Sequence, residues 1–196
     1  LTMHQPSTPP AWHLLNRLAM DKEDTPAKTD ALSKLRHVFE YTAVHEILEE
    51  LNLICTAAMN EAYVWKQGSP GNCLYYYGRL ELLTECCYLF KTCNLKKTLK
   101  SRKCLLPEKL PARMLPIPLT AREFRNPQRV IKSFFRHASL PEWKRQLLVW
   151  TENALSNSSV KDELEAETLL PFIQHLRKLV YAAYLLCQYV YPEKKS

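Results

Sequence analysis

The sequence predicts an all-α protein, and three observations carry this prediction. Glycine occurs three times in 196 residues, whereas β-hairpins need residues that accept positive φ. Apolar residues recur at intervals of three and four over long segments, which is the spacing of one face of an α-helix. The 13 prolines gather between these segments. With 46% hydrophobic residues, a chain of this length can bury a sizeable core, so we expect a single all-α domain spanning residues 1–196.

The sequence predicts a short N-terminal helix and two longer helical regions in the first part of the chain. Trp12, Leu15 and Leu18 lie on one face of the short helix. The apolar pattern is then helical from about residue 30 to about residue 66, and it stops at a turn rich in Gly, Ser, Pro and Asn at residues 68–72. Another helix is expected to run from there to about residue 97.

The second part begins with a basic, Pro-containing connector at residues 98–119, through which no helix can continue. Thr120-x-x-Glu123 and Ser139-x-x-Glu142 have the spacing of capping boxes, which mark helix N-termini. A helix is also expected to start near Asn126. The last helical region should span residues 160–191, and its proline at position 171 should kink or split it.

An internal repeat predicts how these helices are grouped. Residues 30–94 align without a gap on residues 126–190, at an offset of 96, with ten identities where chance gives roughly four. The prediction is a helical bundle of two similar three-helix halves, residues 29–97 and 120–192, packed about a pseudo-twofold axis. Because Thr42-Ala43 matches the boundary at Ala138-Ser139, the long first helical region should break near residues 41–44. Glu46 and Glu142 are matched too, either as capping acids or as a facing carboxylate pair.

The net charge of +7 is concentrated in the middle of the chain. Residues 91–145 contain 15 Lys and Arg against three acidic residues. Arg125, Arg129, Lys132 and Arg136 are expected to share one helical face. The candidate anion- or partner-binding residues are Lys96, Lys97, Lys100, Arg102, Lys103, Lys109, Arg113, Arg125, Arg129, Lys132 and Arg136.

This basic region gives the main functional expectation, a non-enzymatic helical interaction or regulatory module that binds through a basic surface. An acidic protein surface or nucleic acid would fit such charge. Nucleic-acid binding through phosphate contacts is the alternative, although few aromatic residues are interleaved and no recognition motif is present.

A second alternative is a small-ligand or enzymatic site between the two halves. Its candidate polar residues are Glu81, Glu85, Arg177, Tyr88 and Tyr184. Glu81 and Arg177 are matched positions of opposite charge, so they either pair in the interior or remain solvated on the outer face.

The sequence favours no metal or cofactor. It has no Glu-x-x-His pair for a di-iron bundle, no C-x-x-C pair for zinc and no glycine-rich phosphate loop. The seven cysteines are odd in number, and Cys86 and Cys87 are adjacent, which is untypical of a disulfide framework. We therefore expect buried reduced thiols in the cytoplasm. No apolar run reaches the length of a membrane span, so no membrane partner is expected.

Overall fold

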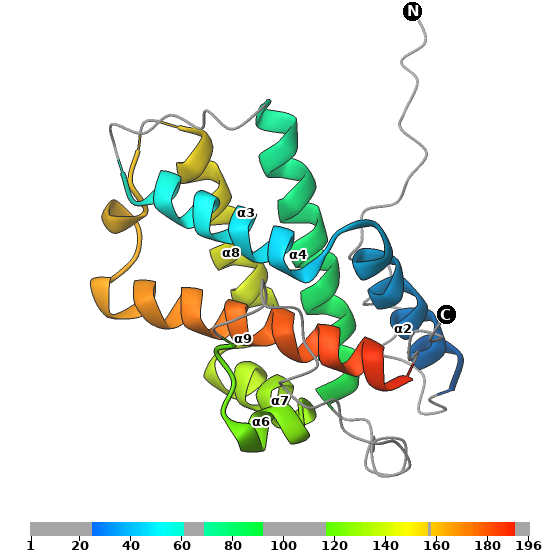
Figure 1. The fold of residues 1–196 in the computed structure, drawn as a ribbon. Helices are drawn as coiled ribbons and strands as arrows, with labels where there is room; N and C mark the ends of the chain where they lie inside the picture. The colour runs from blue at the N-terminus through cyan, green and yellow to red at the C-terminus, as the bar shows by residue number, and fades with distance from the viewer. Residues whose placement is uncertain (1–24, 61–68, 92–116, 157, 191–196) are drawn as a thin grey trace, which may run out of the picture.

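The computed structural model describes residues 25–60, 69–91, 117–156 and 158–190, and all the regular structure in these ranges is helical. The all-α prediction is therefore confirmed. The predicted N-terminal helix and most of the connector lie outside the described residues. No helix in these ranges combines the length and the apolar character needed to cross a bilayer. The elements, drawn in Figure 1, are α2 (Thr25–Tyr41), α3 (Val44–Ala58), α4 (Pro70–Lys91), α6 (Ala121–Arg125), α7 (Gln128–His137), α8 (Leu140–Leu155), a 3-10 turn (Val160–Asp162) and α9 (Ala166–Val190).

The first long helical region is interrupted where the internal comparison predicts. Helix α2 ends at Tyr41 and α3 begins at Val44. Between them Ala43 is extended, with φ −65° and ψ 147°, and its N–H donates to the Glu46 carboxylate at 3.0 Å. Glu46 therefore satisfies a backbone N–H at the start of α3, which is the capping role.

Of the two outcomes expected at Pro171, a kink or a split, the split does not occur. The interruption lies earlier, between the 3-10 turn that ends at Asp162 and the start of α9 at Ala166, and α9 continues through Pro171. Proline leaves the carbonyl four residues before it without a helical donor. That carbonyl belongs to Glu167, in the exposed first turn of α9, where water can reach it.

The N-terminal helices α2, α3 and α4 pack extensively against the C-terminal helices α7, α8 and α9. Helix α3 lies against α8, while α4 contacts α2, α7 and α8. Helix α9 contacts α2, α3, α4 and α7. In Figure 1, α6 and α7 lie together below α9, at the lower edge of the molecule. This arrangement places the basic residues of α6 and α7 on one outer surface.

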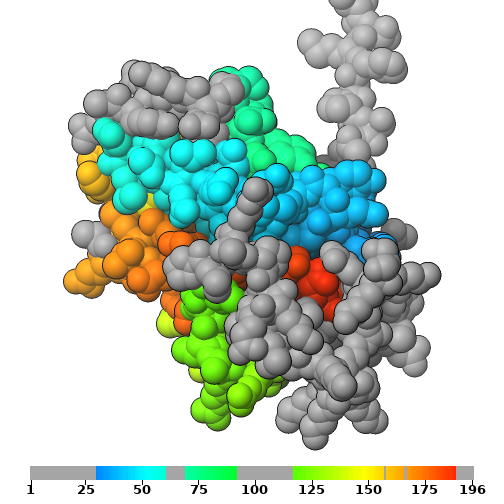
Figure 2. Space-filling model, in the orientation of Figure 1, coloured from blue at the N-terminus to red at the C-terminus, as the bar shows by residue number. Residues whose placement is uncertain are grey.

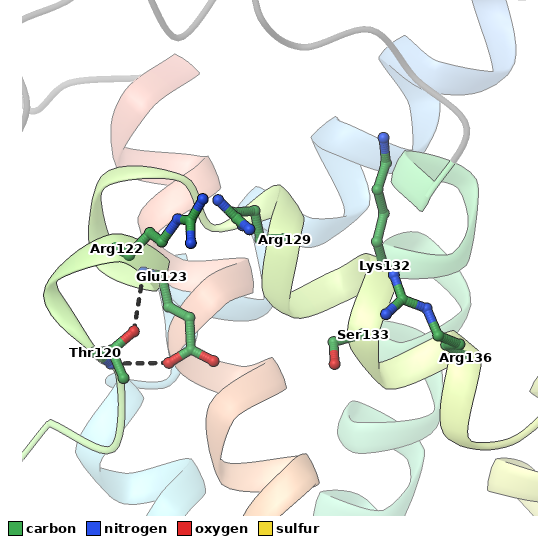
Figure 3. Close-up of a pocket in the computed structure, with 7 residues that line it drawn as sticks. All are labelled: Thr120, Arg122, Glu123, Arg129, Lys132, Ser133 and Arg136. Carbon is green, nitrogen blue, oxygen red and sulfur yellow. Dashed lines mark hydrogen bonds between the residues drawn. The ribbon is translucent and has the colours of Figure 1, made fainter.

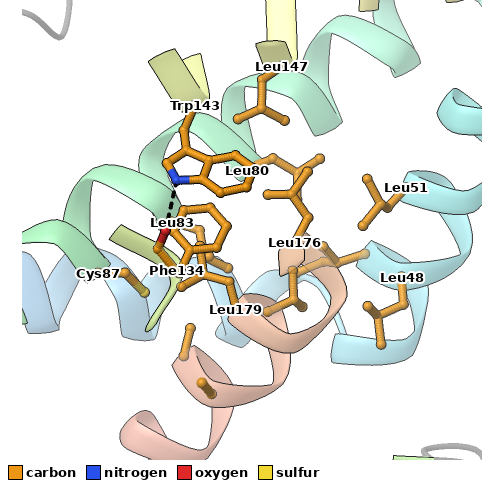
Figure 4. Packing of buried hydrophobic residues seen from close by; sticks show 14 of the residues in the cluster. Leu48, Leu51, Leu80, Leu83, Cys87, Phe134, Trp143, Leu147, Leu176 and Leu179 are labelled. Atoms are coloured by element: carbon orange, nitrogen blue, oxygen red, sulfur yellow. Dashed lines mark hydrogen bonds between the residues drawn. The ribbon is translucent and has the colours of Figure 1, made fainter. Parts of the chain in front are cut away.

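One hydrophobic cluster connects α2, α3, α4, α7, α8 and α9 (Figure 4). The Trp143 ring stacks on Phe134 with centroids 3.9 Å apart, and its Nε1 donates to the Phe134 carbonyl at 3.1 Å. Burying a leucine side chain contributes about 1.5–3 kcal/mol, so the leucines of this cluster supply much of the stability. Those with at most 3% of their surface exposed include Leu51, Leu80, Leu83, Leu147, Leu176 and Leu179.

Two aromatic contacts between the N-terminal and the C-terminal helices have similar geometry. Phe39 of α2 meets Tyr184 of α9 edge to face, with centroids 5.5 Å apart and an interplanar angle of 76°. Phe135 of α7 meets Tyr88 of α4 at 5.2 Å and 80°. The two phenylalanines are 96 positions apart in the sequence, and so are the two tyrosines.

Candidate anion-binding site

The N-terminus of α6 is fixed by a capping box. The Thr120 hydroxyl accepts from the Glu123 N–H at 3.2 Å, and the Glu123 carboxylate accepts from the Thr120 N–H at 2.8 Å. The prediction from Thr120-x-x-Glu123 is confirmed. Helix α6 is short because Asn126 leaves the helical conformation, with φ −142°, and Pro127 follows it before α7 begins. The two helices consequently meet at an angle that lets side chains from both face a common space.

Helices α6 and α7 form a surface pocket of about 410 Å³, which we call the basic pocket. In Figure 3, Arg122 of α6 and Arg129 of α7 point toward one another across it, and Arg136 lies beside Ser133 further along α7. The chain segment that contains both helices reaches the outer surface at the lower edge of Figure 2. The lining residues are Thr120, Arg122, Glu123, Arg129, Lys132, Ser133 and Arg136.

The acidic residue that lines the basic pocket already has a cationic partner. Lys178 Nζ of α9 lies 3.0 Å and 3.2 Å from the two carboxylate oxygens of Glu123. Burial raises the pKa of Glu123, but the hydrogen bonds from Thr120 and Lys178 outweigh burial and hold this pKa below its ordinary value. Glu123 is therefore ionised at neutral pH, and its charge is balanced by Lys178.

The cations of the basic pocket have no such partner. Within the described ranges, the side chains of Arg122, Arg129, Lys132 and Arg136 form no hydrogen bond and no ion pair. All four are exposed. Four positive charges around one concave space create a positive potential that attracts an anion.

The structure brings together part of the predicted basic set and corrects one member of it. Arg129, Lys132 and Arg136 share the outer face of α7, as expected. Arg125 was placed on the same face, but it belongs to α6 and does not line the basic pocket, because Asn126 and Pro127 break the helix after it. The cation that α6 supplies is Arg122, which the helical periodicity did not select. The remaining candidates, Lys96, Lys97, Lys100, Arg102, Lys103, Lys109 and Arg113, lie outside the described residues.

The predicted acidic residues of α4 do meet a partner, but it is Lys144 of α8. Lys144 Nζ lies 3.0 Å from Glu81 Oε1 and also contacts Glu85 Oε1. Glu85 is 6% exposed, so burial raises its pKa above the ordinary value despite the bond from Lys144. Burial lowers the pKa of Lys144, but the bonds to Glu85 and Glu81 outweigh burial and raise it overall. The three residues form a half-buried ionic cluster that joins α4 to α8.

Arg177 does not take part in this ionic cluster. Glu81 is bound to Lys144 and also accepts from the Tyr77 hydroxyl at 3.3 Å, whereas the buried Arg177 Nε has no hydrogen-bond partner in the described part of the chain. The charge of Arg177 acts instead on Cys55 and Tyr181, where it lowers pKa values that burial raises more strongly. An interior pair between Glu81 and Arg177 is thus not found.

The two predicted tyrosines are packing residues at the edges of the core. Tyr88 is 38% exposed, rests on Phe135 and has the Lys91 ammonium 5.6 Å from its ring centroid. Tyr184 is half-buried against Phe39. They therefore do not converge with Glu81 and Arg177 on one site.

The cysteines of the described helices are buried thiols. Burial raises the pKa of Cys55, Cys86 and Cys187 to about 12 and that of Cys73 to about 11, and it raises the pKa of Cys87 well above its ordinary value. A thiol with such a pKa carries almost no thiolate at neutral pH, and the thiolate is the form that reacts or binds metal. No group of three or more His, Cys, Asp or Glu in the described ranges is placed to hold a metal ion.

Comparison with known proteins does not assign the chain to a family. No protein-family model, no curated protein and no solved structure matches it. Its function has to be inferred from the chemistry of its own residues.

Proposed function

We propose that this chain is a non-enzymatic helical binding module and that its basic pocket receives an anionic group of a partner. One observation carries the proposal: Arg122, Arg129, Lys132 and Arg136 surround one concave surface without a counter-ion in the described residues. Exposed like charges repel one another, and a bound anion relieves that repulsion. The buried thiols and the partnered acids described above favour a binding role over a catalytic one.

A comparison within the chain indicates that folding does not require these charges. Helix α2 stands at the positions that match α7, and it packs on α4 as α7 packs on α9. Its residues at the positions of the three α7 cations are Ser33, Arg36 and Glu40. The three positive charges on α7 thus correspond to residues on α2 whose net charge is zero, although the two helices occupy equivalent positions in the bundle. We therefore attribute the excess charge to a contact outside the fold.

This comparison rests on our inference that the chain contains two similar three-helix halves, α2–α4 and α7–α9. The reciprocal contacts support it, since a pseudo-twofold axis that exchanges the halves also exchanges Phe39–Tyr184 with Phe135–Tyr88. The helix boundaries support it as well, because α2 and α7 both end two residues before the next helix starts. The basic pocket belongs to one half, so it breaks the symmetry of the bundle.

A partner with clustered negative charge fits this surface better than single-stranded nucleic acid. Proteins that bind single strands stack bases on aromatic side chains, and among the described residues no aromatic side chain lines the basic pocket. Binding is expected to weaken steeply with salt, because the charges that drive it are exposed. An acidic protein segment or a small polyanion therefore remains the preferred class of partner.

The proposal is tested by comparing two variants with equal net charge. The first is Arg129→Gln/Lys132→Gln/Arg136→Gln, and the control is Arg36→Gln/Arg79→Gln/Lys161→Gln, whose residues belong to α2, α4 and the 3-10 turn and do not line the basic pocket. Retention on heparin and binding of fluorescent poly-L-glutamate should fall for the first variant and stay near wild type for the control. Equal losses in both variants, or no binding by the wild type at low salt, would contradict the proposal. Preferential binding of single-stranded DNA would establish the nucleic-acid alternative instead.

A further inference from the structure

We infer that the basic pocket binds a small molecule or headgroup that carries two or more phosphate groups. This inference rests on the proposed anion-binding function and specifies its ligand. The chemistry is shared by soluble polyphosphorylated compounds and by phosphorylated lipid headgroups, which the experiment below distinguishes.

The length of the basic pocket calls for more than one anionic group. Arg129 and Arg136 are seven residues apart on α7, which corresponds to about 10 Å at the rise of an α-helix. Arg122 and Arg129 point toward one another at one end, and Arg136 lies beside Ser133 at the other (Figure 3). A single phosphate group cannot contact both ends. The arrangement therefore provides two positions, one between the paired arginines and one near Arg136, with Lys132 on the helical turn between them.

The number of charges matches phosphate better than carboxylate. A phosphate monoester carries about 1.5–2 negative charges at pH 7, so two of them balance about four cations. Two carboxylates would neutralise half of the positive charge. Arginine also binds phosphate through two parallel hydrogen bonds, and three of the four cations are arginines. The Ser133 hydroxyl is a further donor at the end near Arg136.

The lining also defines the rest of the ligand. In the described part of the chain, Thr120, Ser133 and the charged residues line the basic pocket without an aromatic side chain, and the methylene stems of the arginines and of the lysine add apolar surface. The volume of about 410 Å³ lies within the range of small-molecule sites. A compact hydroxylated ring with phosphate substituents suits this lining, whereas a nucleobase finds no aromatic side chain to stack on among the described lining residues.

Glu123 limits how much negative charge the ligand can bring close to α6. Its carboxylate lies among the lining residues and is held by Lys178. Replacing it, Glu123→Gln, removes a charge that repels the ligand, so phosphate binding should tighten about threefold or more even though the ion pair is lost. A variant that binds better while losing a native contact is not explained by damage to the fold.

The experiment is calorimetric titration of the full chain with inositol hexakisphosphate and with inositol 1,4,5-trisphosphate. Arg122→Gln/Arg129→Gln should weaken the binding of both ligands at least about tenfold, since it removes the charge-assisted hydrogen bonds at one end of the basic pocket. The control Arg36→Gln/Lys161→Gln should bind like wild type. An unchanged midpoint of thermal unfolding verifies that each variant is folded. Vesicles with phosphatidylinositol 4,5-bisphosphate, compared with phosphatidylserine vesicles of equal charge, test the lipid source.

The outcomes separate this inference from the proposed function. Tighter binding of inositol hexakisphosphate than of inositol hexasulfate, and its loss in Arg122→Gln/Arg129→Gln, supports the phosphate assignment. Equal affinity for the sulfate compound, or binding of poly-L-glutamate without binding of the inositol phosphates, overturns the assignment and leaves the anion-binding function standing. Absence of binding to every anionic probe overturns both.

Discussion

Lys144 provides a stringent test of how α8 is held against α4. Replacing it by alanine leaves Glu85, which is 6% exposed, with a buried charge and no cation in contact. Breaking a buried ion pair costs about 3–5 kcal/mol, and the partial exposure of Lys144 and Glu81, 19% and 22%, reduces this to about 2–3 kcal/mol. For a chain of this length that destabilisation should lower the unfolding midpoint by roughly 4–12 °C.

The pH dependence of the stability of Lys144→Ala shows whether the unpaired Glu85 charge causes its destabilisation. The pKa of Glu85 is raised in the folded protein, so Glu85 binds its proton more tightly when folded than when unfolded. The stability from that protonation is present in full below the unfolded pKa and is lost as pH rises through the folded pKa. Without Lys144 the folded pKa rises further. The destabilisation of Lys144→Ala relative to wild type should therefore be largest near pH 7 and shrink toward pH 4.5.

The assay is urea unfolding followed by circular dichroism at several pH values. Lys91→Ala is the control, because Lys91 is also a half-buried cation. Within the described residues its ammonium contacts the Tyr88 ring and no carboxylate, and such a cation–π contact contributes about 1 kcal/mol or less. In the double variant Glu85→Gln/Lys144→Ala, the loss in unfolding free energy should be smaller than the sum of the two single losses. Glu85→Gln removes the carboxylate charge that Lys144→Ala leaves without a partner. A loss below about 1 kcal/mol for Lys144→Ala, or one that is constant with pH, would refute the reasoning.

Three further predictions concern the core and one histidine. Trp143→Phe should lower the unfolding free energy measured in urea by about 1–2 kcal/mol more than Trp150→Phe does. The Trp143 indole donates to the Phe134 carbonyl, whereas the buried Trp150 Nε1 has no partner in the described part of the chain. Equal losses in the two variants would contradict a contribution from the Trp143 hydrogen bond. Burial and nearby positive groups lower the pKa of His175, so stability should fall as pH drops from about 6.5 through the lower folded pKa, and His175→Gln should flatten that slope. Leu176→Ala should cost about 2–5 kcal/mol, since the side chain is 0% exposed; a cost below 1 kcal/mol would contradict its place in the core.

The sequence allowed the helices to be predicted better than the sites. Helix boundaries follow from local chemistry, so the capping box at Thr120 and the break after Tyr41 were accessible from residue types and spacing. Pro171 shows the limit of such rules, because a proline near the exposed start of a helix leaves its orphan carbonyl to water rather than ending the helix. The local rule identified the carbonyl that loses its helical donor, but the split that was one of the two expected outcomes does not occur.

The partner of Glu85 could not be predicted from its own helix, because it depends on the packing of α4 against α8. A signal was nevertheless present. Lys144 matches Leu48 in the internal alignment, and a charged residue at the position of a buried leucine needs a counter-charge in the interior.

For the basic pocket, too, the sequence predicted what depends on one helix but not what depends on how two helices meet. Periodicity predicted that Arg129, Lys132 and Arg136 share a face of α7. It could not predict that the chain turns between α6 and α7, which removes Arg125 from that face and brings Arg122 into the pocket instead. A surface built from two helices is defined by the turn that joins them.

The most direct test of the account is nuclear magnetic resonance of the arginine side chains during titration with inositol hexakisphosphate. The Nε–Hε signals of Arg122, Arg129 and Arg136 should shift in a saturable manner, while the signal of Arg36 on α2, which aligns with Lys132 in the sequence, should remain in place. Saturable shifts of those three signals alone would show that the basic pocket is the anion site. Shifts of Arg36 of equal size, or no shift of the three pocket arginines, would contradict the central claim.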